Sequence, residues 1–164
     1  MVFVTLGTQD KTFERLIEAV ENQVKKQNIK EEVIVQAGST KYVSDFVKII
    51  PYMNENEFHD YMKKANIIIT HGGVGTIIEG LELKKKMIVV PRLAKYGEHV
   101  NDHQVQIVEN FEKSGYILAV YDLKKLDLVL AKLKEFIPKE YKKNNDKFVN
   151  KLEEEIQNLL VLKN

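Results

Sequence analysis

The chain of 164 residues contains no cysteine, no tryptophan and only 3 prolines. The absence of cysteine excludes a disulfide framework, a thiol nucleophile and a zinc–thiolate site, and it is typical of a reducing compartment. The chain also lacks an excess of one charge, because its 25 Lys and Arg residues nearly balance its 24 Asp and Glu residues, which leaves a net charge of +1. The chain therefore has no overall basic field that would attract nucleic acid or anionic lipid. We expect no nucleic-acid partner.

Long hydrophobic runs are missing as well. The longest, such as Ile67 to Ile69 and Met87 to Val90, fall far short of the ~18 to 20 apolar residues that cross a bilayer. The apolar residues 1–6 follow no basic segment, so they do not predict a secretory signal. We expect a cytoplasmic protein whose membrane role, if it has one, is peripheral or depends on a partner.

What the sequence does contain is an alternation of short β-branched runs with longer segments of helical period. This pattern is typical of a parallel sheet covered by helices on both faces, and it predicts one Rossmann-like three-layer α/β domain over residues 1–164. The predicted strands are residues 2–6, 32–36, 45–50, 66–70, 87–90 and 116–120. The predicted helices are residues 11–27, 54–65, 76–83, 102–113, 123–136 and 140–162. The last helix is amphipathic, and its apolar stripe either covers the domain's own sheet or contacts a partner.

Ligands of such sheets bind outside the carboxyl ends of the strands, where this sequence places its glycines. Gly7 and Thr8 follow the first strand, in either a plain tight turn or a turn that approaches an anion. The run from His71 to Thr76 is a stronger indication, because three glycines in four positions separate a strand from a helix. Its backbone amides and helix end could bind a diphosphate, although it has neither the G-x-G-x-x-G pattern nor a P-loop lysine.

Other polar residues near these strand ends have two interpretations. Glu79 could accept hydrogen bonds from ribose hydroxyls or could be an ordinary solvated helix residue. The loop after the fifth predicted strand concentrates donors and acceptors, but its histidines lack the H-E-x-x-H context of a metal site. No serine lies on a G-x-S-x-G elbow, so a serine hydrolase is not predicted. The residues alone indicate a phosphate-bearing, nucleotide-like ligand and define no reaction. The polar residues of this loop are Arg92, Glu98, His99, Asn101, Asp102, His103 and Gln104.

The motifs resemble the carboxyl-terminal, donor-binding domain of family 28 glycosyltransferases over about residues 1 to 160. The resemblance rests on Val4 to Thr8, Tyr52-Met53, Ala65 to Thr76 followed by Glu79, Val90 to Arg92, and Asn101 to Gln104. It implies the C-terminal half of a GT-B glycosyltransferase, similar in length to the small subunits of split transferases. The loop 97–104 looks closest to the bacterial exopolysaccharide and capsule branch, which is related to the eukaryotic cytosolic subunit of the dolichol-linked N-acetylglucosamine transferase.

The resemblance also implies roles for individual residues in binding a UDP-sugar. The backbone of Met53 would meet uracil, Glu79 would bind the ribose hydroxyls, and residues 71–76 would surround the diphosphate. His103 and Gln104 would approach the sugar, while the turn after the first strand would border the reaction cleft. The expected substrate-binding residues are Gly7, Thr8, Met53, His71, Gly72, Gly73, Gly75, Thr76, Glu79, Arg92, Asp102, His103 and Gln104.

Members of this family invert the anomeric carbon by direct displacement and need no bound metal, so we expect no cofactor and no metal ligand. In single-chain relatives the amino-terminal domain holds the lipid acceptor and commonly the general base. The resemblance therefore implies a membrane-anchored partner subunit that binds the acceptor and supplies the base, with His103 as an alternative base. A homo-oligomer of the isolated chain is left open.

The resulting hypothesis is the catalytic, donor-binding subunit of a two-component inverting glycosyltransferase. It would move a sugar from a UDP-sugar to a lipid-diphosphate-linked saccharide in exopolysaccharide or capsule synthesis, at the inner face of the membrane. One alternative is a non-catalytic, UDP-sugar-binding enhancer of a separately active transferase. Another is a sugar-nucleotide epimerase, which ordinarily needs two such domains.

Overall fold

Six strands run parallel in one sheet, in the order β3-β2-β1-β4-β5-β6, in the computed structural model, which describes residues 1–142 and Glu154. Each predicted strand overlaps an observed one, so the predicted parallel sheet is confirmed. The last strand is shorter than predicted, because only two of its residues pair with β5. The strands are β1 (Val2–Thr5), β2 (Val33–Gln36), β3 (Lys48–Ile50), β4 (Ile67–His71), β5 (Lys86–Val90) and β6 (Leu118–Ala119).

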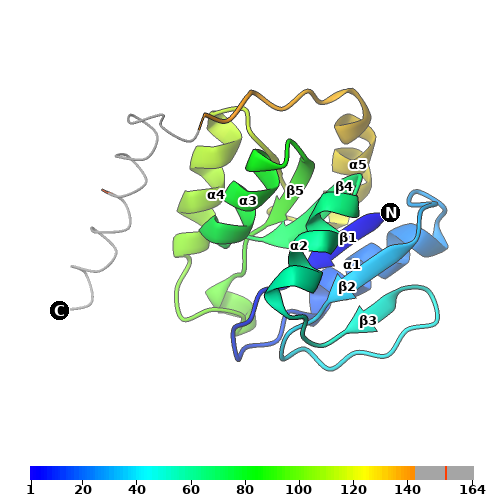
Figure 1. Ribbon diagram of the computed structural model, residues 1–164. Helices are drawn as coiled ribbons and strands as arrows, with labels where there is room; N and C mark the ends of the chain where they lie inside the picture. Colours follow the sequence, from blue (N-terminus) through cyan, green and yellow to red (C-terminus); the bar gives the residue numbers. More distant parts are fainter. Residues whose placement is uncertain (143–153, 155–164) are drawn as a thin grey trace.

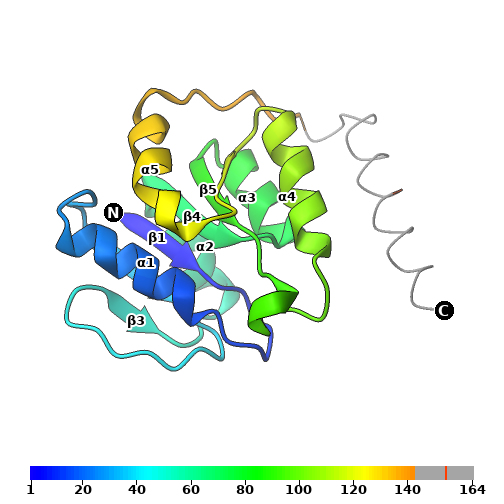
Figure 2. The ribbon, with the colours of Figure 1, turned by 180° about the vertical axis from the view of Figure 1, so that it is seen from behind.

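Helices cover both faces of the sheet, which confirms the predicted three layers. Figure 1 shows α2, α3 and α4 in front of the strands, and Figure 2 shows α1 and α5 on the opposite face. The predicted helix 140–162 lies outside the described residues except for residues 140–142, which are not helical, and Glu154. The helices are α1 (Glu14–Lys25), α2 (Glu55–Lys64), α3 (Val74–Glu82), α4 (His103–Lys113) and α5 (Leu126–Glu135), with 3-10 turns η1 (Ala94–Tyr96) and η2 (Leu123–Lys125).

The apolar core consists of two layers, one on each side of the sheet. Along β1, Val2 and Val4 pack toward α1 and α5, whereas Phe3 packs toward the helices on the other face. Successive strand residues point to opposite faces, and here both faces are buried. This explains why the strands read as continuous apolar runs rather than as an alternating pattern. None of the helices in the described part of the chain combines the length and apolar character that a membrane-spanning helix needs.

Two helices begin in ways that matter for the site. The α2 helix starts with a capping box, in which the Asn54 side chain accepts from the Glu57 amide while the Glu57 carboxylate accepts from the Asn54 amide. The α3 helix begins at Val74, two residues earlier than predicted. Gly73 is its N-cap, so Gly75 lies in the first turn, where backbone amides have no partner within the helix. Val74 and Gly75 therefore belong to the helix, whereas the sequence predicted that they lie in the turn before it.

The strand order contains a topological switch point between β1 and β4. These strands are neighbours in the sheet, yet the chain leaves β1 toward β2 on one side and β4 toward β5 on the other. Loops that leave adjacent strands in opposite directions open a crevice at the carboxyl ends, which is where ligands bind in doubly wound sheets. Gly7 and Gly72 follow these two strands, so the sequence places glycine-containing turns on both sides of the crevice.

Candidate functional site

A cavity of 400 Å³ lies at the switch point. It brings together the turns after β1 and β4, the end of β2 and the start of α2. Seven predicted site residues line it, whereas Gly72, Glu79 and the residues of the loop after β5 do not. The lining residues are Thr5, Gly7, Thr8, Gln9, Gln36, Met53, Glu55, Phe58, His71, Gly73, Gly75 and Thr76.

The imidazole of His71 fills the space between the two glycine turns. A Cβ atom at Gly7 would lie 2.6 Å from its Nε2, and a Cβ at Gly73 would lie 2.4 Å from the same atom. Gly7 also has a φ of +77°, which favours glycine. The ring is buried, and its Nδ1 lies 3.3 Å from the Thr70 hydroxyl. Gly7 and Gly73 are therefore both required because the imidazole of His71 leaves no room for a Cβ atom at either position.

Burial lowers the pKa of His71 to about 4, and the nearby charge of Arg92 acts in the same direction. A hydrogen bond with the Thr5 carbonyl opposes this shift but does not cancel it. The ring is consequently neutral at pH 7. It brings no positive charge to a ligand, and its single N–H is used within the protein.

This pKa makes the stability of the domain depend on pH. The unfolded chain binds a proton at histidine near pH 6.5, whereas folded His71 resists protonation down to about pH 4. Unfolding is therefore favoured as the pH falls through this range, and we expect His71 to reduce the free energy of unfolding by about 3 kcal/mol between pH 7 and 4. Urea denaturation at several pH values would measure the loss. A His71→Gln variant should lack this part of it, and equal pH dependence in both proteins would contradict the assignment.

The described lining of the cavity has no formal positive charge, and Glu55 adds a carboxylate to it. None of the residues that line it in the described chain is Lys or Arg. Instead, the first turn of α3 directs unpaired backbone amides and the positive end of the helix dipole toward it. Gly73 and Gly75 add no side chain that would cover these amides. Such an arrangement can bind phosphate oxygens through backbone hydrogen bonds.

Glu79 stands one helical turn beyond Thr76, at the side of the cavity. Its Oε1 lies 2.7 Å from Nδ1 of His59, which belongs to α2. Their side chains are 30% and 43% exposed, so the pair is open to solvent rather than buried in the core. His59 was not among the residues expected from the sequence, because twenty positions separate it from Glu79.

Arg92 lies outside the cavity, with its guanidinium enclosed by loops. It is 1% exposed and donates to the carbonyl oxygens of Leu6 at 2.6 Å, Lys11 at 2.9 Å and Glu98 at 3.2 Å. Its Cζ lies 4.9 Å from the centre of the Phe13 ring. These contacts join the loops after β1 and β5. Arg92 therefore fixes the positions of the loops beside the crevice without facing the cavity itself.

The remaining predicted residues do not line the cavity, although Gln104 lies against the glycine turn. Gln104 is buried, and its Oε1 accepts from the Arg92 amide at 3.0 Å. The Asp102 carboxylate accepts from the amide of Ala94 at 2.8 Å and holds the loop after β5. A Cβ at Gly72 would meet Cβ of Gln104 at 3.0 Å, which shows how closely α4 approaches the turn. His103 is half-buried at the start of α4.

The cavity also contains residues that the sequence did not indicate. Gln36 is buried at the end of β2, and its Oε1 accepts from the Thr5 hydroxyl at 2.7 Å. Phe58 and Glu55 come from α2. No motif marks them, but their positions at a strand end and in a first helical turn are signals that the predicted topology could have supplied.

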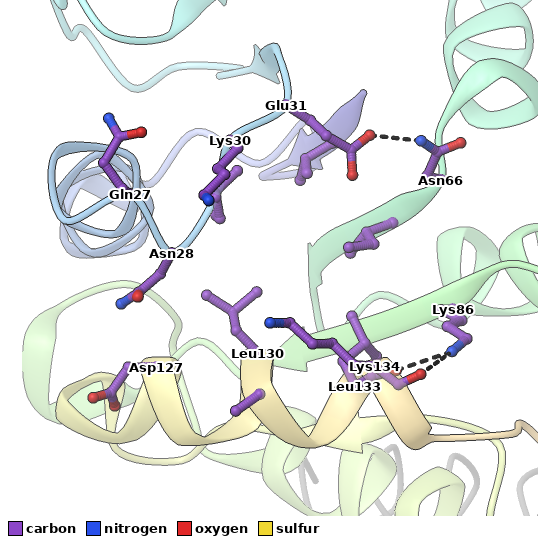
Figure 3. A pocket seen from close by; sticks show the side chains of 14 residues that line it. Gln27, Asn28, Lys30, Glu31, Asn66, Lys86, Asp127, Leu130, Leu133 and Lys134 are labelled. Carbon is purple, nitrogen blue, oxygen red and sulfur yellow. Dashed lines mark hydrogen bonds between the residues drawn. The ribbon is translucent and has the colours of Figure 1, made fainter.

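A larger groove, of 640 Å³, lies at the amino ends of β1, β4 and β5, between the end of α1 and α5 (Figure 3). Several of its polar groups are satisfied within the chain. Glu31 accepts from Asn66, and Lys86 donates to the carbonyl oxygens of Leu133 and Lys134. None of the predicted site residues lines this groove. Size alone therefore does not identify the functional site, and the switch-point cavity is the better candidate.

No group of three or more His, Asp or Glu side chains is placed to share a metal ion within residues 1–142. The fold and site together define the class as Rossmann-like α/β domains with a ligand cavity at the topological switch point. A family model described as the glycosyltransferase family 28 C-terminal domain matches residues 1–159, so the chain belongs to this family.

Relatives and solved structures agree with this assignment. The chain is 29% identical to the UDP-N-acetylglucosamine transferase subunit ALG13 of Candida glabrata, over 63% of this chain and 49% of that protein. It is 31% identical to a UDP-N-acetylglucosamine–N-acetylmuramyl-(pentapeptide) pyrophosphoryl-undecaprenol N-acetylglucosamine transferase of Clostridium perfringens, over 62% of this chain and 26% of that enzyme. The chain thus spans about half or less of these relatives.

The fold of this chain is also that of solved glycosyltransferase domains. The solution structure of ALG13 has a TM-score of 0.60 at 20% identity, covering 90% of this chain and 92% of that one. MurG of Acinetobacter baumannii has a TM-score of 0.57 at 16% identity, covering 80% and 40%. At these identities the similarity establishes the GT-B type of fold, which was predicted, and nothing finer. The similarity to the bacterial exopolysaccharide branch stays a prediction.

Proposed function

We propose that this chain is the catalytic, donor-binding subunit of a two-component inverting glycosyltransferase that uses a UDP-sugar. The observation that carries the proposal is the cavity at the switch point, where two glycine turns enclose His71 and expose the amide end of α3. The relatives add support, because they are named as UDP-N-acetylglucosamine transferases.

In this proposal different parts of the cavity bind the diphosphate, the uracil and the ribose of the nucleotide. The amides at the start of α3 hold the diphosphate, and the neutral His71 ring lies beside Gly73, the N-cap of that helix. Met53, which lines the cavity beside α2, contacts uracil. Glu79, at the side next to α2, binds the ribose hydroxyls. His103 and Gln104, at the start of α4, lie toward the sugar. Arg92 and Asp102 hold the surrounding loops.

The reaction proposed is a direct displacement. A hydroxyl oxygen of the acceptor forms a bond with the anomeric carbon while the bond from that carbon to the β-phosphate oxygen breaks. A general base takes the hydroxyl proton, and the electron pair of the broken bond leaves on UDP. Backbone amides and the α3 dipole stabilise the negative charge that develops on the diphosphate.

We further propose that a membrane-anchored partner subunit provides the base and binds the acceptor, a lipid-diphosphate-linked saccharide of exopolysaccharide or capsule synthesis. The chain would then act at the inner face of the membrane. Two facts support a partner. The Candida glabrata relative is named a transferase subunit. Among the described residues that line the cavity, the one histidine, His71, and the one carboxylate, Glu55, form no hydrogen bond with each other, so the lining holds no carboxylate–histidine pair.

Calorimetric titration of the purified chain with UDP, GDP and a panel of UDP-sugars, with and without magnesium, tests the donor site. We expect UDP compounds to bind selectively without magnesium, and the tightest sugar to identify the donor. A Glu79→Gln variant should weaken UDP binding about 10- to 100-fold, because a charged acceptor of ribose hydrogen bonds is lost. Equal binding of UDP and GDP, or no binding of either, would reject the proposal.

A further inference from the structure

The contact between His59 and Glu79 joins two helices at one side of the cavity. His59 follows Phe58, which lines the cavity, and Glu79 lies one turn after Thr76, which also lines it. The 2.7 Å contact uses Nδ1 of the imidazole and Oε1 of the carboxylate. Since the carboxylate accepts, the Nδ1–H group donates.

A contribution to the stability of the fold does not explain why His59 and Glu79 form this contact. Both side chains are substantially exposed, and exposed ion pairs contribute little to stability. The α2 helix is held independently by its capping box and by Met62, which is fully buried in the core. Loss of the His59 imidazole should therefore leave the fold intact.

The contact does restrict the carboxylate itself. A free glutamate side chain samples many rotamers, and ordering it on ligand binding weakens the affinity. The hydrogen bond to His59 holds Oε1 in place before a ligand arrives, while Oε2 has no hydrogen-bond partner among the described residues. A carboxylate held by one oxygen presents the other, and the second lone pair of the first, to two adjacent hydroxyl groups.

We propose that His59 is a positioning residue that orients Glu79 toward the vicinal hydroxyls of the nucleotide ribose. It thereby contributes to discrimination between ribonucleotides and deoxyribonucleotides. This inference rests on the proposed donor site and extends it to a residue on a different helix.

The test compares UDP with 2′-deoxyuridine diphosphate by calorimetry, using the full chain. The wild-type protein should prefer UDP by about 10- to 100-fold, because the 2′-hydroxyl donates to a carboxylate. His59→Ala should weaken UDP binding about 5- to 10-fold and deoxy-UDP binding much less, so that the preference falls. His59→Asn should recover part of the preference, since its amide nitrogen can replace Nδ1. Asp60→Ala, at the exposed neighbouring position on α2, is the matched control and should match wild type.

The outcomes separate this inference from the donor-site proposal. Absence of UDP binding by the wild-type chain defeats both. UDP binding without discrimination against deoxy-UDP removes the ribose role of Glu79, and with it the role of His59. If the wild type discriminates and His59→Ala discriminates equally, Glu79 binds ribose without help and only the inference is overturned. Circular dichroism of each variant confirms that the comparison is made on folded protein.

Discussion

Replacing Arg92 with methionine is expected to lower the free energy of unfolding by about 3 to 5 kcal/mol. Methionine fills much of the same volume, but the carbonyl groups of Leu6, Lys11 and Glu98 lose their buried donor. For a domain of this size the loss corresponds to about 10 °C in melting temperature. Thermal or urea denaturation would measure it.

The control is Lys95→Met, which removes a positive charge from an exposed position in the same loop. Its unfolding free energy should stay within about 0.5 kcal/mol of wild type. A stable Arg92→Met protein that has lost UDP binding would contradict the structural role and would favour the direct substrate contact expected from the sequence.

Replacing Gly73 with alanine should weaken UDP binding about 100-fold, although the change adds a single methyl group. The new Cβ would lie 2.4 Å from Nε2 and 2.8 Å from Cε1 of His71. Because the ring is buried, either it or the start of α3 must shift. Loss of a backbone hydrogen bond to a charged phosphate costs about 1.5 to 3 kcal/mol, or up to about 100-fold in affinity. Overpacking of this kind should also lower the free energy of unfolding by about 1 to 3 kcal/mol.

Two further variants isolate the cause. Gly75→Ala adds a methyl group where no atom lies within 4 Å, in a helical turn where alanine is favoured over glycine, so it should not destabilise the domain. Combining Gly73→Ala with His71→Ala removes the clashing ring, and the double variant should be more stable than the sum of the two single changes predicts. Strict additivity would show that the clash is relieved in another way.

The sequence was sufficient to predict the architecture, and seven of the residues that it indicated line one cavity. The strands are buried on both faces, so they are recognisable in the sequence as continuous apolar runs. Gly7 and Gly73 could be expected to lie together because the carboxyl ends of parallel strands meet on one side of the sheet. The start of α3 was missed, since a first helical turn tolerates glycines that would weaken a helix interior.

The contacts between distant loops could not be predicted in this way. Arg92 resembles a solvent-facing residue at the start of a polar loop, and its burial depends on the loop after β1, about eighty positions away. The contact of His59 with Glu79 likewise depends on how α2 and α3 pack side by side. Hydrophobic periodicity indicates which face of each helix is buried but not which polar side chains meet at the edges.

The enclosure of His71 by Gly7 and Gly73 also has an evolutionary consequence. As long as position 71 carries an imidazole, we expect both glycines to be retained for reasons of shape, whatever the ligand. If a lineage exchanges the imidazole for a small residue, position 73 gains room for a side chain, whereas Gly7 still needs its positive φ. Positions 71 and 73 should therefore covary among homologues, while position 7 stays fixed.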